Sequence, residues 1–212
     1  MPRWFWIALL VLGVASWLAL RGPGAPAPAQ SLDGGGVRCA LPPLWSGTDN
    51  PRQSEDDGMA PFRLGRAQVT PLAGFSLEAR VLSRQDYGMG AESEFSPTDL
   101  ALGWGPMAAE GMAERLSVSQ GGRWYRYRWG SDGPPLPPAQ IVRNSANMHM
   151  IPADESVAEA LDAVHAGDTV EVHGWLVRIE RDDGWKWKSS TSRSDSGDGS
   201  CELVYVCRIE TR

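Results

Sequence analysis

The chain has 212 residues, of which 42% are hydrophobic and 22% are charged, values that are ordinary for a globular protein. The first 32 residues contain two Arg and no acidic residue, whereas the remaining 180 contain 18 basic and 26 acidic residues. That length suits one domain with a substantial core. A domain this acidic repels phosphate backbones, which argues against nucleic acid as its partner.

An uncharged segment of 17 residues, Trp4–Leu20, lies between Arg3 and Arg21. At ~1.5 Å per residue a helix of this length spans about 25 Å, the short end for a bilayer core. We therefore expect residues 1–21 to form a single-pass anchor in the inner (plasma) membrane. Arg3 and the α-amino group favour a cytoplasmic N-terminus, which places the domain in the periplasm or outside the cell.

The alternative for this segment is a cleaved signal peptide, because Ala27-Pro28-Ala29 has small residues at the spacing of a cleavage site. The apolar run is longer than the usual ~7–15 residues of such peptides. Both interpretations export the domain.

Residues 22–36 (GPGAPAPAQSLDGGG) are expected to be a flexible tether, since Pro and Gly offer no side chain to bury. The soluble domain then comprises residues 37–212. An anionic lipid surface would repel a domain of this net charge, so we expect the N-terminal helix to be its link to the membrane.

The first half of the domain shows two strand patterns and one helix start. Alternating apolar residues predict a strand at 75–81, and RWYRYRW predicts another at 123–129. Ser96-Pro97-Thr98-Asp99 resembles an N-cap followed by Pro, which predicts a short helix. A second helical stretch is expected at 107–116.

The second half predicts one helix and three strands. Asp154 can cap a helix that ends near Gly167. A strand follows, with an expected bulge at Gly174, then a tight turn at 182–184 and further strands at 185–190 and 201–209.

Together these elements predict an α+β domain behind the N-terminal transmembrane helix. It would have a mainly antiparallel sheet and two or three short helices. The last three strands follow one another with short turns, so a small curled barrel of the oligonucleotide/oligosaccharide-binding type is one shape that the sheet could take.

Three blocks of sequence are distinctive: SPTDLALGWGPM (96–107), NMHMIP (147–152) and WKSSTSRSDSGDGSCE (187–202). With the Gly-Asp-x-Val turn at Gly167 they resemble a family of uncharacterised, membrane-anchored bacterial proteins. The resemblance covers roughly residues 75–206. It implies an exported address and no particular activity.

His149 and Cys201 are the candidate catalytic residues. A thiolate nucleophile needs a base beside it, and His is the usual partner. Asn147 or Asp99 could orient the imidazole. The alternative is structural: Cys201 would begin a buried strand and His149 would pin a loop.

A charged, Gly-rich stretch near residue 200 is the candidate ligand loop. Arg193, Asp195 and Glu202 could bind an anion or a sugar, or could pair to hold a hairpin loop in shape. Asp99 and Trp104 are further candidates, and their alternatives are a helix cap and a core residue. The spacing fails for a calcium-binding EF-hand, the three His are not grouped, and we expect neither metal nor cofactor.

The chain has three cysteines, so one thiol is left after any internal disulfide. Chain ends often lie close together and export permits disulfides, which favours Cys39–Cys207. Cys201 and Cys207 would be about 20 Å apart on one extended strand, too far for a bridge unless Cys201 belongs to the preceding loop.

Two functions from different classes follow from these features. The first is a binding or structural module of the cell envelope, with an envelope protein or a small polar ligand as its partner. The second is an envelope hydrolase or transferase with Cys201 as nucleophile and His149 as base.

Overall fold

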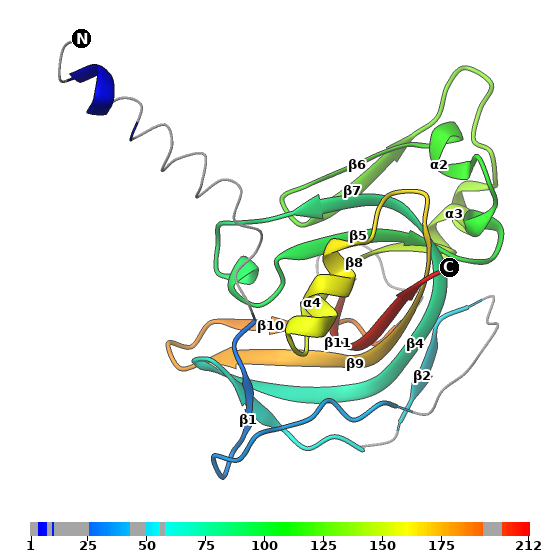
Figure 1. The fold of residues 1–212 in the computed structure, drawn as a ribbon. Helices are drawn as coiled ribbons and strands as arrows, with labels where there is room; N and C mark the ends of the chain where they lie inside the picture. Colours follow the sequence, from blue (N-terminus) through cyan, green and yellow to red (C-terminus); the bar gives the residue numbers. More distant parts are fainter. Residues whose placement is uncertain (1–3, 8–9, 11–25, 43–49, 56–57, 193–200) are drawn as a thin grey trace.

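The computed structural model describes residues 4–7, 10, 26–42, 50–55, 58–192 and 201–212 (Figure 1). Within these residues no helix is long and apolar enough to span a membrane. Most of the expected membrane segment, residues 4–20, lies outside the described residues, and so do Arg193 and Asp195.

Strands dominate the described part of the chain. They are β1 (Ala29–Ser31), β2 (Arg52–Ser54), β3 (Phe62–Leu64), β4 (Ala67–Asp86), β5 (Thr98–Gly103), β6 (Ser117–Gly121), β7 (Trp124–Arg128), β8 (Ser145–Pro152), β9 (Thr169–Arg181), β10 (Lys186–Lys188) and β11 (Glu202–Thr211). The helical elements are short: η1 (Glu92–Glu94), η2 (Gly105–Ala108), α2 (Met112–Arg115), α3 (Pro138–Arg143) and α4 (Glu155–Asp162).

Five of the strands pair in a closed order, β4–β5–β8–β11–β9 and back to β4. Four of these pairings are antiparallel, and the fifth, β8 with β11, is parallel. The sheet is therefore ring-like, although it does not form a regular barrel (Figure 1). The predicted α+β class with a mainly antiparallel sheet and few helices is confirmed.

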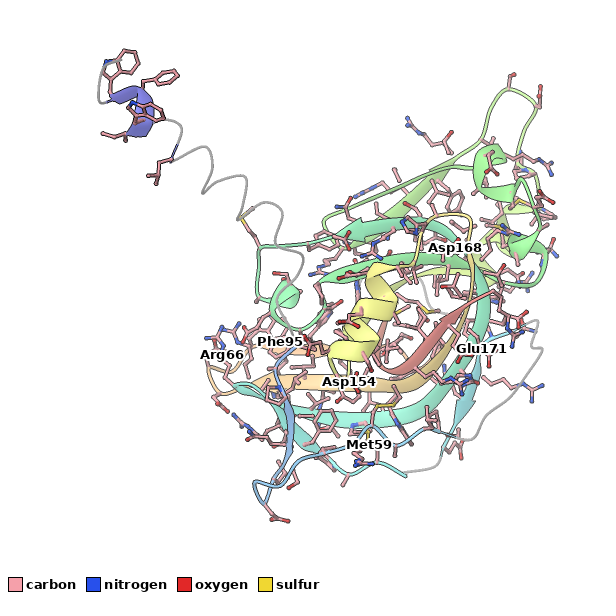
Figure 2. The ribbon with its side chains drawn as sticks, in the orientation of Figure 1. Met59, Arg66, Phe95, Asp154, Asp168 and Glu171 are labelled. Carbon is pink, nitrogen blue, oxygen red and sulfur yellow. A yellow bond between two sulfur atoms is a disulfide. The ribbon has the colours of Figure 1, made fainter. Side chains whose placement is uncertain are left out.

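The inner side of the ring holds the largest apolar cluster, to which all five strands contribute. Helix α4 covers this cluster with Val157 and Leu161. The helix begins as predicted, because Asp154 accepts a hydrogen bond from the Val157 backbone N–H at 3.0 Å (Figure 2). Buried side chains of this kind supply most of the free energy of folding.

Two further layers cover the outer side of the ring. One is built from β1 and β3 and packs Phe62 and Leu64 against Trp175 and Tyr205. The other is the separate two-stranded sheet β6–β7 with α2 and α3, which covers Leu82 and Ala101. The outer surface of β5 and β8 lies beside this second layer.

The predicted helix after Ser96 is wrong, because residues 98–103 form strand β5 between β4 and β8. All six residues of β5 are buried. Ladder hydrogen bonds on both edges and burial on both faces outweigh the local capping signal at Ser96-Pro97, since helix propensity is a weak prior.

The tether prediction also needs correction in its second half. Ala29–Ser31 form β1, which pairs with β3, and Gln30 bridges to Gly36. An edge strand is held by backbone hydrogen bonds, so it needs no large side chains and leaves a weak signal in the sequence.

Gly174 does not form the expected bulge, because β9 is continuous there. From Trp175 onward the residues on the outer face of β9 are apolar because a second layer covers them. The alternation of inner and outer residues therefore continues unchanged through Gly174. The irregularity lies on the partner strand, between Val206 and Arg208. Gly174 is needed for a close approach: a Cβ at this position would lie 2.1 Å from the Tyr205 carbonyl oxygen.

Replacing Gly174 with Ala should therefore destabilise the protein by about 3 kcal/mol, because the clash is with backbone that cannot rotate away. Urea unfolding of the full chain measures this. Gly121→Ala is the matched control, since an added Cβ there meets no atom within 4 Å. Equal effects of the two substitutions would contradict the close packing of β9 on β11.

Candidate functional site

Strands β5 and β8 place polar side chains on the outer surface of the ring. Asp99 on β5 is directly opposite His149 on β8, while their neighbours Leu100 and Met148 point into the inner core. Asp99 is fully buried, and His149 is 2% exposed. The alternation of the two strands thus buries a carboxylate and an imidazole under the β6–β7 layer.

Asp99 accepts hydrogen bonds from three side chains. Arg123 Nη1 donates to Oδ1 at 2.7 Å, and His149 Nδ1 lies 2.9 Å from the same oxygen. Asn147 Nδ2 donates to Oδ2 at 3.1 Å. A buried carboxylate is costly unless it is paired and hydrogen-bonded, and these partners meet both conditions.

Gln120 and Asn147 extend the network to the hairpin. Gln120 Nε2 donates to Asn147 Oδ1 at 2.7 Å, and Asn147 Nδ2 also donates to the Arg123 carbonyl at 3.1 Å. Each of these two amides therefore joins the β6–β7 layer to the ring. Such networks fix one arrangement of the groups that they connect.

The turn between β6 and β7 places Arg123 in contact with this network. Gly122 and Arg123 are the two central residues of the turn, with φ of 59° and 69°, the pattern of a type I′ hairpin. Within the described residues Arg123 is the only non-glycine with positive φ. This conformation costs free energy, which the ion pair with Asp99 and a hydrogen bond from Arg123 Nη2 to the Ser96 carbonyl (2.9 Å) offset.

Aromatic rings enclose the guanidinium of Arg123. It lies 3.9 Å from the ring centroid of Tyr87 and 5.7 Å from that of Trp187. The Arg123 backbone N–H also donates to the Tyr87 hydroxyl at 3.2 Å. Burial raises the pKa of Tyr87, so its hydroxyl stays protonated and neutral.

A row of rings continues outward from His149. The His149 and Trp187 rings are 4.8 Å apart, Trp187 and Trp185 are 5.9 Å apart, and Trp185 stacks on Phe95 at 6.0 Å. Both Trp are half-buried, at and just before the edge strand β10. We call Phe95, Trp185 and Trp187 the aromatic ledge; Phe95 marks its place in Figure 2.

A cavity of about 320 Å³ adjoins the ledge. Tyr87 and Phe95 line it from the β4–β5 loop, and Ala158 and Leu161 line it from α4. Tyr87 therefore separates this cavity from the polar network.

The structure brings together only some of the residues singled out by sequence. His149 and Asp99 meet, as do Asn147 and Asp99. Glu202 is buried at the start of β11, next to half-buried Cys201, and β11 runs beside β8 with Leu203 opposite His149. Trp104 is 1% exposed, belongs to the inner core and lies beyond the far end of β5, so the structure does not place it as a platform beside Asp99.

Four residues of the site were missed: Tyr87, Gln120, Arg123 and Trp187. Only Arg123 had a usable local signal, because a Gly-Gly-Arg sequence between two strand patterns indicates a turn with positive φ. The other three reach the site through strand pairings that local sequence does not record.

Cys39 and Cys207 are joined by a disulfide, with their Cα atoms 5.3 Å apart. The bond connects the segment before β2 to strand β11. Cys201 takes no part in it.

Metal binding has no support in the described residues, which contain no group of three or more His, Cys, Asp or Glu that could hold a metal ion.

Comparison of the chain with protein-family models, with curated proteins and with solved structures finds no match. The function must therefore be argued from the geometry of the site.

Arg123→Ala should destabilise the protein by about 3 kcal/mol, because it leaves the Asp99 carboxylate buried beside His149 without its cation. Denaturant unfolding at neutral pH measures the loss. Arg63→Ala is the matched control: it removes a pair with Asp182 on the surface, and we expect little change. A small effect of Arg123→Ala would show that the network does not depend on this ion pair.

Proposed function

We propose that the protein is a binding module of the cell envelope, attached by its N-terminal segment, and that it binds an uncharged glycan on the aromatic ledge, beside the buried network of β5 and β8. The observation that carries this proposal is the half-buried pair Trp185 and Trp187 beside the ion pair of Asp99 and Arg123. The anchor and the exported location remain predictions from the sequence.

The aromatic ledge suits the flat apolar face of a sugar ring. Aromatic rings carry partial negative charge on their faces, and the C–H bonds of a pyranose carry partial positive charge, so the two stack. Trp presents a large, rigid surface and loses little conformational entropy on binding. Two half-buried Trp rings 5.9 Å apart offer neighbouring surfaces of this kind.

The charge of the site favours a neutral ligand. The Asp99 carboxylate and the Arg123 guanidinium are 2.7 Å apart and cancel one another. The polar groups beside the ledge are largely buried and are already hydrogen-bonded to one another, so a ligand would meet chiefly the aromatic rings.

The order of the strands supports this location. We infer that the ring is a partly open form of the oligonucleotide/oligosaccharide-binding arrangement, in which ligands lie over the second and third strands between two flanking loops. The second and third strands of this ring are β5 and β8. The loop after β4 supplies Tyr87 and Phe95, and the segment after β9 supplies Trp185 and Trp187.

Replacing Trp187 with Ala should weaken glycan binding about tenfold, the effect of losing one stacking contact. The test uses the full chain in a sugar-free detergent, with cellohexaose and chitohexaose as neutral probes and binding followed by calorimetry. Trp129→Ala is the matched control, because Trp129 is 41% exposed and lies away from the ledge.

Three results would contradict this proposal. One is that neither neutral oligosaccharide binds. The second is that Trp187→Ala and Trp129→Ala weaken binding equally. The third is that an acidic oligosaccharide such as hexagalacturonate binds more tightly than the neutral probes.

A second candidate function, an envelope hydrolase or transferase, is favoured by the contact between Asp99 and His149. A carboxylate that holds Nδ1 of a His is the arrangement that prepares Nε2 to act as a base. Cys201 directly precedes β11, which runs beside β8, and its thiol could give a proton to His149 and attack an acyl carbon, with that proton passing on to the leaving group.

Iodoacetamide labelling distinguishes this second function. If Cys201 is a nucleophile, it should react quickly below pH ~7, where an ordinary thiol of pKa ~8.5 is mostly protonated, and His149→Ala should abolish that reactivity. Mass spectrometry of the native and unfolded protein measures both. Labelling only after unfolding would eliminate the nucleophile.

A further inference from the structure

One part of this acidic protein is basic. From Arg115 to Ala153, both included, the chain has five Arg and a single acidic residue, Asp132. This span includes the whole of the β6–β7 hairpin, which lies at one side of the ring (Figure 1). Positive charge is therefore concentrated on one layer of the fold.

Two arginines of the hairpin, Arg126 and Arg128, point outward. Val118, Tyr125 and Tyr127 pack inward on the core beneath the hairpin. Arg126 and Arg128 alternate with the two Tyr and are exposed. Their partners across the hairpin are Ser119 and Ser117, which are too short to cover them. We call Trp124, Arg126 and Arg128 with the two Ser the basic face.

The arginines of the basic face are not neutralised. In the part of the chain that the structure describes, Arg126 and Arg128 form no ion pair, nor does the exposed Arg115 next to the hairpin. Several arginines elsewhere in the described chain pair with carboxylates, namely Arg63, Arg66, Arg84, Arg181, Arg208 and Arg212, whereas Arg38, Arg52, Arg80 and Arg143 do not. In a protein with excess carboxylates, this leaves the basic face available to an anionic partner.

We propose that the basic face docks on an anionic phospholipid surface. Arg side chains bind lipid phosphates through several N–H groups and place their apolar stems along the headgroup region. Trp, which is half-buried at position 124 and 41% exposed at position 129, prefers the same interface. Docking adds a second contact with the membrane that the N-terminal segment is expected to enter.

The net charge of the domain does not prevent this contact. At physiological ionic strength the interaction between exposed charges is largely screened beyond ~8 Å, so a membrane senses the face that touches it more than the charge of the far side. Arg123, which belongs to the same hairpin, is turned inward to Asp99 and takes no part.

Hydrogen exchange of the full chain in nanodiscs tests the proposal. Peptides within residues 117–130 should exchange more slowly in discs containing about one third phosphatidylglycerol than in discs of phosphatidylcholine alone. In the double variant Arg126→Glu, Arg128→Glu the protection gained in the anionic discs should be about thirtyfold smaller, as expected for the loss of two Arg near an anionic surface.

Arg38→Glu is the matched control, because Arg38 is exposed and forms no ion pair in the described residues, but lies outside the hairpin. It should leave the protection unchanged, and unchanged thermal unfolding of both variants would show that the fold is intact. The proposal is overturned if protection is equal in the two kinds of disc or survives the double substitution. It is also overturned if inorganic phosphate alone gives the same protection, since the face would then bind free anions. None of these outcomes depends on glycan binding at the aromatic ledge.

Discussion

A buried carboxylate without enough partners would destabilise this protein, and the arrangement around Asp99 follows from that constraint. Because Asp99 is buried on β5, its carboxylate requires a cation and several hydrogen-bond donors as partners. Asn147 and His149 come from β8, but the cation comes from a separate hairpin, where Arg123 adopts a costly backbone conformation to reach it. The same contact that stabilises Asp99 thus holds the β6–β7 layer against the ring, and it fixes the position of Arg123 beside Trp187 of the aromatic ledge.

Much of the fold could be predicted where the signal is local. The helix from Asp154, the strands at 75–81 and 123–129 and the antiparallel character of the sheet follow from spacing and capping. Strand β5 could not be recognised, because its local signal is that of a helix start and only its neighbours β4 and β8 make it a strand. The parallel pairing of β8 with β11 was missed for a similar reason, since it joins segments far apart in the sequence.

The same difference between local and long-range signals applies to the candidate site. Asp99 and His149 could be proposed singly from their residue types. Their contact depends on register across β5 and β8, which the sequence of either strand does not contain. Arg123 and Trp187 come from layers outside the ring, so their roles become visible only when those layers are placed. One hairpin then serves two surfaces: Arg123 faces the site, while Arg126 and Arg128 face outward.

The disulfide has a consequence for the whole chain. Cys39 and Cys207 are 168 residues apart in the sequence, so nearly all of the domain lies inside one covalent loop. A protease that cut a single peptide bond between them would leave the two fragments attached, and the non-covalent contacts between strands would not have to hold them together alone. In a compartment rich in proteases, the domain could therefore be nicked once, keep the proposed glycan site assembled, and separate into pieces only after chemical reduction and unfolding.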